Sequence, residues 1–97
     1  MATIIRAHDG QEFSVSPKNK EIGFTLQELY DLIGNNCDCV EHITLADGRS
    51  MWLDEEGKFR KPLLHKNAKA TRLLHKAGGM PEDYVVGNVL IEKGEVQ

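Results

Sequence analysis

The sequence contains no long hydrophobic run, and this absence excludes an ordinary membrane-spanning helix. No apolar stretch of the 97 residues approaches the roughly 20 residues that a transmembrane helix needs. The first residues also lack a basic segment followed by an apolar one, so a secretory signal is not expected. We therefore expect a cytoplasmic protein.

Cysteine is also scarce, with only Cys37 and Cys39 in the chain. A disulfide between residues this close would close a strained loop, so free thiols in a reducing compartment are expected. Together with His42, and with His65 or His75 as a fourth ligand, the pair could bind zinc. The usual zinc knuckle, however, has about two to four residues between its cysteines. We predict no metal and no cofactor.

The sequence lacks the usual catalytic patterns as well. The serines Ser14, Ser16 and Ser50 sit in no glycine-flanked elbow, and no phosphate-binding glycine loop is present. The run Asp54–Glu56 could serve a metal-dependent enzyme. A solvated turn in which Gly57 supplies a positive φ is the favoured interpretation. We therefore predict no catalytic residues and a non-enzymatic protein.

The hydrophobic pattern centres on one hairpin. Two apolar runs, 40–45 and 50–53, flank Asp47-Gly48, and an Asp-Gly pair between such runs is a strong hairpin signal. Trp52, the only tryptophan, alternates with its neighbours and should face away from them. We expect the rest of the chain to pack around this hairpin.

Three further strands follow from the same kind of pattern. Residues 2–7 and 11–15 form a second hairpin around Asp9-Gly10. Residues 84–91 form the last strand, with a bulge at Gly87.

Two amphipathic helices carry clear start signals. Thr25 and Glu28 form a capping box for a helix over 25–33. Asn67 is a good N-cap for a second helix over 68–77.

These elements predict an α+β fold in the order ββαββαβ. We expect one domain over 1–97, with a frayed tail at 92–97. The sheet should be mostly antiparallel or mixed, with both helices packed on one face. Side chains from both helices, Leu29 and Ile33 from the first and Leu73 and Leu74 from the second, should then be buried together.

Charge is unevenly distributed along a chain whose net charge is −3. Residues 58–76 hold seven basic residues and no acid, while the remainder holds five basic residues and all fifteen acids. On the second helix Lys69, Arg72 and Lys76 form one stripe, and the helix N-terminus adds positive partial charge. A solvated helix face is the alternative interpretation. The predicted anion- or partner-binding residues are Lys58, Arg60, Lys61, Lys66, Asn67, Lys69, Arg72 and Lys76.

An ordered set of motifs covers about two thirds of the chain. They are the helix 26–34, the turn pattern 47–58, Asn67-x-x-Ala70-Thr71 and the strand 85–90. With this set the chain resembles a small domain of unknown function carried by phages, plasmids and their bacterial hosts. The resemblance implies a mobile-element origin and a small α+β fold, and it assigns no catalytic residues.

We therefore expect a small accessory protein, of phage or mobile-element type, that binds and neutralises a host factor. Counter-defence is the expected setting, by blocking a defence protein or by sequestering a nucleotide signal in the host cytoplasm. The partner would be a host protein or an anionic small molecule. A nucleic-acid-binding protein that uses the basic 58–76 face is one alternative, and a metal-dependent enzyme that uses Asp54–Glu56 is another.

Overall fold

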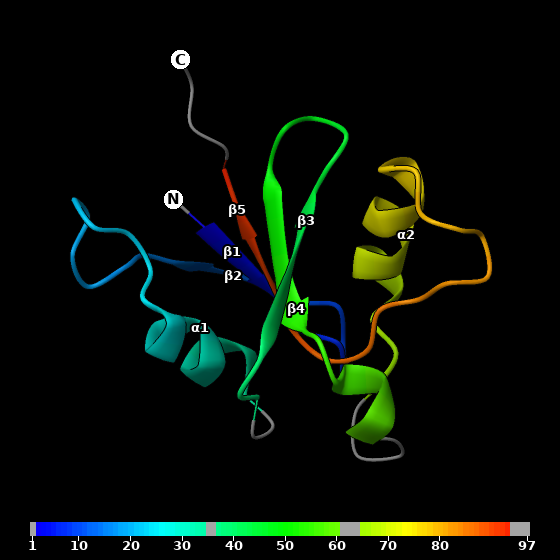
Figure 1. The fold of residues 1–97 in the computed structure, drawn as a ribbon, viewed down its shortest axis with the longest axis horizontal. Helices are drawn as coiled ribbons and strands as arrows, with labels where there is room; N and C mark the ends of the chain where they lie inside the picture. Colours follow the sequence, from blue (N-terminus) through cyan, green and yellow to red (C-terminus); the bar gives the residue numbers. More distant parts are fainter. Residues whose placement is uncertain (1, 35–36, 61–64, 94–97) are drawn as a thin grey trace.

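The computed structural model describes residues 2–34, 37–60 and 65–93. The elements are β1 (Ala2–Ile5), β2 (Glu12–Val15), α1 (Leu26–Ile33), β3 (Val40–Thr44), β4 (Ser50–Asp54), the 3-10 helix η1 (Gly57–Arg60), α2 (Ala68–Lys76) and β5 (Val89–Glu92) (Figure 1). The predicted ββαββαβ order is confirmed, and η1 is an addition to it.

All five strands form one antiparallel sheet in the order β2-β1-β5-β4-β3, which confirms the α+β class. The centre of the sheet is β5, whereas the β3–β4 hairpin forms one side with β3 at the edge. Three successive β5 residues, Val89, Leu90 and Ile91, are buried. A continuous apolar run of this kind indicates a strand that is covered on both faces.

The two helices lie on opposite faces of the sheet, so the prediction of one shared face is wrong (Figure 1). Leu29 of α1 packs with Ile4 and Leu90 in the α1-side core. On the other face, α2 contributes Ala70 and Leu73 to the α2-side core. Neighbouring strand residues point to opposite faces, and here both sets are apolar, so each face needs its own helix.

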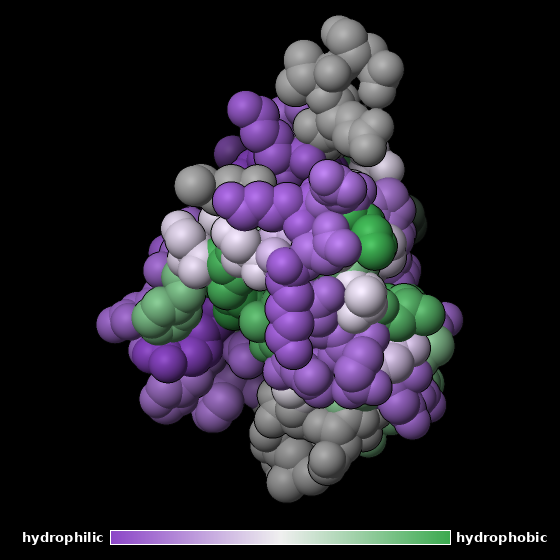
Figure 2. Space-filling model, turned by 90° about the vertical axis from the view of Figure 1, so that its left-hand side faces the viewer, coloured by the Kyte–Doolittle hydropathy of each residue, from purple (hydrophilic) through white to green (hydrophobic). Residues whose placement is uncertain are grey.

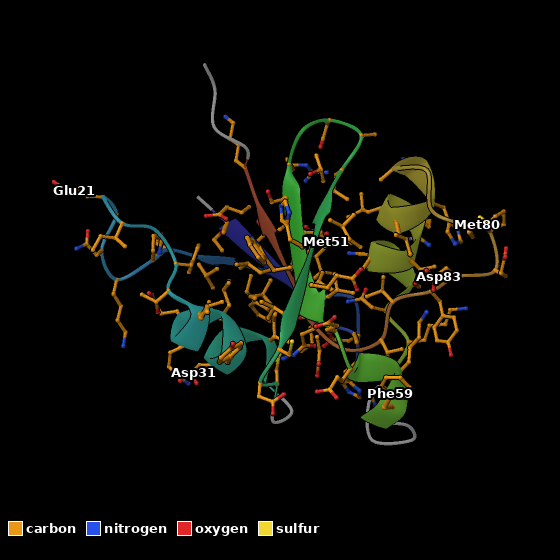
Figure 3. All side chains as sticks on the ribbon, viewed as in Figure 1. Glu21, Asp31, Met51, Phe59, Met80 and Asp83 are labelled. Atoms are coloured by element: carbon orange, nitrogen blue, oxygen red, sulfur yellow. The ribbon has the colours of Figure 1, made fainter. Side chains whose placement is uncertain are left out.

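The β4 strand shows the same alternation. Trp52 packs against the α1-side core, and Met51 and Leu53 belong to the α2-side core. The predicted orientation of Trp52 is therefore confirmed. Met51 is fully buried near the middle of the molecule (Figure 3).

The predicted hairpin turns and the first helix cap are also present. Gly10 and Gly48 have φ values of 72° and 89°, a region that glycine enters without strain. In α1 the Glu28 N–H donates to the Thr25 hydroxyl at 3.2 Å, and the Thr25 N–H donates to the Glu28 carboxylate at 3.0 Å. The capping box is thereby complete.

The last strand is shorter than predicted at its start and longer at its end. Val86 forms only an isolated bridge with Lys66, and Gly87 follows it with φ 86°. Glu92 belongs to β5, not to a tail, because it pairs with Ala2 and with Ser50. Residues 94–97 of the predicted tail lie outside the described residues. Among the residues that are described, no helix has the length and apolar character to cross a membrane.

Candidate functional site

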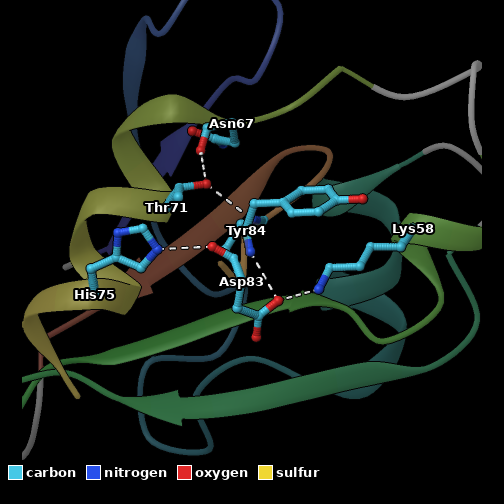
Figure 4. A network of polar contacts seen from close by, with 7 residues as sticks. Lys58, Asn67, Thr71, His75, Asp83 and Tyr84 are labelled. Atoms are coloured by element: carbon cyan, nitrogen blue, oxygen red, sulfur yellow. Dashed lines mark hydrogen bonds and ion pairs between the residues drawn. The ribbon is translucent and has the colours of Figure 1, made fainter. Parts of the chain in front are cut away.

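In the described part of the basic segment, several cations contact other groups of the fold itself. Lys58 lies in η1, where its ammonium pairs with the Asp83 carboxylate and stands 4.6 Å from the centre of the Tyr84 ring (Figure 4). The ammonium of Lys66 stands 5.4 Å from the same ring centre. The hydrogen bond from Lys58, helped by the Tyr84 backbone N–H, lowers the pKa of Asp83. Lys58 is thus partly neutralised within the fold.

Asn67 is a buried structural residue, so its predicted place in an anion-binding site is wrong. Its side-chain oxygen accepts from the Ala70 N–H at 3.1 Å, which caps α2 as predicted. Its side-chain nitrogen donates to the carbonyls of Ile5 at 3.1 Å and Gly87 at 3.0 Å. No polar group of Asn67 is left to meet a ligand.

The predicted basic stripe on α2 is reduced to two residues. The Lys69 ammonium pairs with the Glu12 carboxylate of β2 at 3.1 Å. Arg72 and Lys76 are exposed and form no ion pair with any described residue. We call these two the Arg72–Lys76 pair.

The side chains of two residues of the predicted site, Arg60 and Lys61, are not among those that the structure describes. The Arg60 backbone closes η1, and Lys61 lies outside the described residues.

A polar network fixes α2 to the segment that precedes β5 (Figure 4). The Thr71 hydroxyl donates to the Asn67 carbonyl at 2.7 Å and accepts from the Val85 N–H at 2.9 Å. The ring of His75 forms a 2.8 Å hydrogen bond with the Asp83 carbonyl. These contacts make Thr71 and His75 structural residues.

The acidic turn differs from the predicted solvated turn. Asp54 is buried, and its carboxylate accepts the Glu56 N–H at 2.9 Å. Gly57 has no positive φ; a side chain there would approach the Val86 carbonyl to 3.0 Å. A larger residue at this position would therefore crowd the Val86 backbone. In the described part of the chain, no group of three or more His, Cys, Asp or Glu residues could hold a metal ion.

Both cysteines are free thiols, as predicted. Cys37 is buried, and the Cys39 thiol donates to the Glu55 carboxylate at 2.7 Å. This hydrogen bond, followed by partial burial and by the negative charges of nearby acids, raises the pKa of Cys39 to about 11. The thiol is therefore a poor nucleophile and a poor metal ligand at neutral pH.

A groove on the α1 side was missed by the sequence analysis. It has a volume of about 630 Å³ and lies between the 16–24 segment, α1 and the sheet. We call it the α1-side groove. Its lining residues are Ser16, Pro17, Lys20, Glu21, Ile22, Gly23, Phe24, Leu26, Leu29, Trp52 and Glu92. The signal available in the sequence was Trp52 itself, since its orientation away from Met51 and Leu53 was predicted.

Polar contacts hold the sheet side of this region in place. The Trp52 indole N–H donates to the Glu92 carboxylate at 3.2 Å, and the His42 ring lies 4.6 Å from the indole, centre to centre. His42 also forms a 2.8 Å hydrogen bond with the Ser50 hydroxyl. A nucleophile–base pair needs a third group to orient the imidazole. Within the described residues, the hydrogen bond to Ser50 is the one found for the His42 ring, and no third group orients the ring.

The fold and these two surfaces define a small α+β domain with exposed cations on one side of its sheet and a groove on the other. The chain belongs to the family described as domain of unknown function DUF3846, whose sequence model matches residues 3–95. This confirms the resemblance to a domain of unknown function. No match was found among curated proteins or among solved structures.

Proposed function

We propose that this protein is an accessory protein of phages or other mobile elements that binds and neutralises a host factor without catalysing a reaction. The expected setting is counter-defence in the cytoplasm of the host. Support comes from the motif resemblance and from the segregation of positive charge into one segment. We propose the exposed Arg72–Lys76 pair as the contact point.

The Arg72–Lys76 pair is the observation that carries this proposal. Residues four apart on a helix lie about 5–6 Å from each other at their Cβ atoms, so the two cations act on one patch. The opposite side of α2 is anchored through Ala70 and Thr71, which are buried. An exposed guanidinium binds carboxylates or phosphates in a bidentate manner. A convex helix face matches an acidic protein surface better than it encloses a small nucleotide, so we favour the blocking of a defence protein.

The test is charge reversal of the pair. We expect an Arg72→Glu/Lys76→Glu variant to fold, because exposed helix positions accept glutamate at little cost. Lys69 is left unchanged, because glutamate there would face Glu12. Wild-type protein immobilised in host lysate should retain a partner that the double variant loses. Retention should weaken as salt rises.

A charge-matched control separates the pair from net charge. Lys18→Glu/Lys93→Glu changes the charge equally at exposed positions outside α2. This control should retain the same partner, as identified by mass spectrometry of proteins and of released small molecules. Neutralisation should be stoichiometric, with the partner or nucleotide recovered chemically intact. Retention of the partner by the α2 double variant, or catalytic consumption of the ligand, would refute the proposal.

Nucleic-acid binding is the second candidate function, because of one aromatic side chain. Phe59 is 84% exposed and follows Lys58 in η1. In Figure 3 it lies at η1, on the same side of the sheet as α2. An exposed ring of this kind is suited to stack on a base of a single strand. Salt-dependent binding of a labelled single strand, lost in Phe59→Ala, would favour this function over the first.

A further inference from the structure

We propose that the α1-side groove is a second docking surface, which binds a segment of a partner protein that presents an aliphatic side chain beside a lysine or arginine. The groove lies on the opposite face of the sheet from α2. It therefore goes beyond the function proposed above and does not depend on it.

The size and position of the groove suit a few side chains of a partner. Its volume of about 630 Å³ falls within the range of about 300–1,000 Å³ that is typical of ligand sites. Figure 2 views this side of the molecule, where hydrophobic atoms lie recessed between polar ones. Residues of α1 and of the sheet form its walls together with the 16–24 segment.

The apolar part of the groove is exposed where a partner would enter. Ile22 is 73% exposed and Leu26 is 59% exposed. Both line the groove together with Phe24 and the indole of Trp52. Single exposed aliphatic residues are common on protein surfaces, but several around one hollow indicate an interaction site. An aliphatic side chain placed here would remove both its own surface and that of the rim from water.

The charges of the lining select a cationic neighbour for that aliphatic group. Glu92 contributes a carboxylate at the sheet side of the groove, whereas the Glu21 side chain points outward from the tip of the 16–24 segment (Figure 3). Glu92 is held at the groove by the indole N–H of Trp52 at 3.2 Å. A fixed carboxylate loses little freedom when it pairs with a guanidinium or ammonium. A phosphate-bearing ligand would instead be repelled by the fixed Glu92 carboxylate.

Trp52 gives the experiment a built-in reporter, because it is the only tryptophan and lines the groove. The probes are an acetylated, amidated Lys-Leu-Leu-Lys peptide, its Glu-Leu-Leu-Glu counterpart, and AMP. Tryptophan emission is recorded as each probe is titrated. We expect a saturable response to the basic peptide, and binding of the acidic peptide and of AMP at least tenfold weaker. Glu92→Gln, which removes the charge but keeps an acceptor for the Trp52 N–H, should weaken the preference for the basic peptide.

Matched variants test whether the response comes from the groove. Ile22→Ser/Leu26→Ser removes the exposed aliphatic rim and should weaken binding of the basic peptide at least tenfold. Met80→Ser is the control, since Met80 is 62% exposed and lies on the α2 side (Figure 3). Circular dichroism checks that every variant folds.

Several outcomes would overturn the proposal. They are no saturable response in the wild type, equal affinity for both peptides, stronger binding of AMP, or an unchanged response in the rim variant. Concentration-dependent dimerisation in sedimentation experiments, abolished by the rim variant, would assign the groove to a second copy of this chain instead. The Arg72→Glu/Lys76→Glu variant should bind the basic peptide as the wild type does, so the two proposals fail separately.

Discussion

Asn67 caps a helix and at the same time joins two other parts of the chain. Its position before α2 identifies the cap from local sequence alone. The carbonyls that receive its side-chain nitrogen belong to Ile5 and Gly87, which are distant in sequence. A buried amide must satisfy its donors within the protein. The fold therefore makes a structural residue of one that the basic segment had suggested as a binding residue.

Glu55 controls the reactivity of Cys39, which gives a prediction at the residue scale. We expect Glu55→Gln to replace the charged acceptor that raises the Cys39 pKa to about 11 with a neutral one, and to return the pKa toward 9.0. A full return to 9.0 would raise the thiolate fraction at pH 8 about a hundredfold, partly offset by the lower nucleophilicity of a less basic thiolate. The net alkylation rate with iodoacetamide should rise roughly tenfold. Peptide mapping by mass spectrometry locates the modified cysteine.

The same hydrogen bond fixes the sign of a stability effect. The folded-state pKa of Cys39 is raised, so its stabilising contribution is full below the unfolded pKa of 9.0 and declines as pH rises toward about 11.

Glu56→Gln serves as the control for the alkylation experiment, because Glu56 acts on the thiol only through its charge. Equal alkylation rates in wild type and Glu55→Gln would show that the thiol–carboxylate contact is absent in solution.

At the scale of elements, each helix stabilises its own face of the sheet. The residues of β5 alternate between the two sides: Leu90 belongs to the α1-side core, whereas Val89 and Ile91 belong to the α2-side core. Both helices therefore contact the same strands without sharing a core.

This separation predicts independent contributions to stability. Leu29→Ala should lower the free energy of unfolding by about 2–5 kcal/mol, because Leu29 is buried. Leu73→Ala should lower it less, by about 1–2 kcal/mol, because Leu73 is only partly buried. In the double variant the effects should add to within about 0.5 kcal/mol. Urea unfolding measures each value.

A second pair of variants provides the comparison. Leu73 and Val89 share the α2-side core, so Leu73→Ala and Val89→Ala should show a clear interaction energy. Strong coupling between Leu29 and Leu73 would place both helices on one face and contradict the structure.

At the scale of the whole molecule, β5 is the strand that joins the two halves of the sheet. It pairs with β1 on one side and with β4 on the other, while β2 and β3 lie at the edges. The chain reaches β5 last, so the sheet is incomplete until its final described strand is in place.

Hydrogen exchange should therefore be slowest in β5. Exchange of the Val89, Leu90 and Ile91 amides requires both cores to open, which approaches global unfolding. Amides of the edge strands β2 and β3 should exchange faster through local opening. Amide exchange followed by nuclear magnetic resonance measures both. Protection of β3 equal to that of β5 would contradict the central position of β5.

Local signals determined much of this protein from sequence alone. The Thr25–Glu28 capping box, the Asn67 cap and the turns at Gly10 and Gly48 involve residues close in sequence, so their patterns predict structure directly. The order of elements and the free cysteines follow from information of the same kind. The orientation of Trp52 follows because side chains alternate along a strand.

Only the tertiary structure decided which face each helix covers and which cations remain exposed. The apolar run of β5 is typical of a strand that is buried on both sides, yet we predicted both helices on one face, because the pairing that puts β5 at the centre of the sheet joins strands distant in sequence. Likewise Lys58 and Lys69 belong to the same basic segment as Arg72, but their acidic partners, Asp83 and Glu12, come from elsewhere in the chain. The α1-side groove exists only where the 16–24 segment, α1 and the sheet meet. Contacts between residues distant in sequence depend on the fold, and local pattern does not encode them.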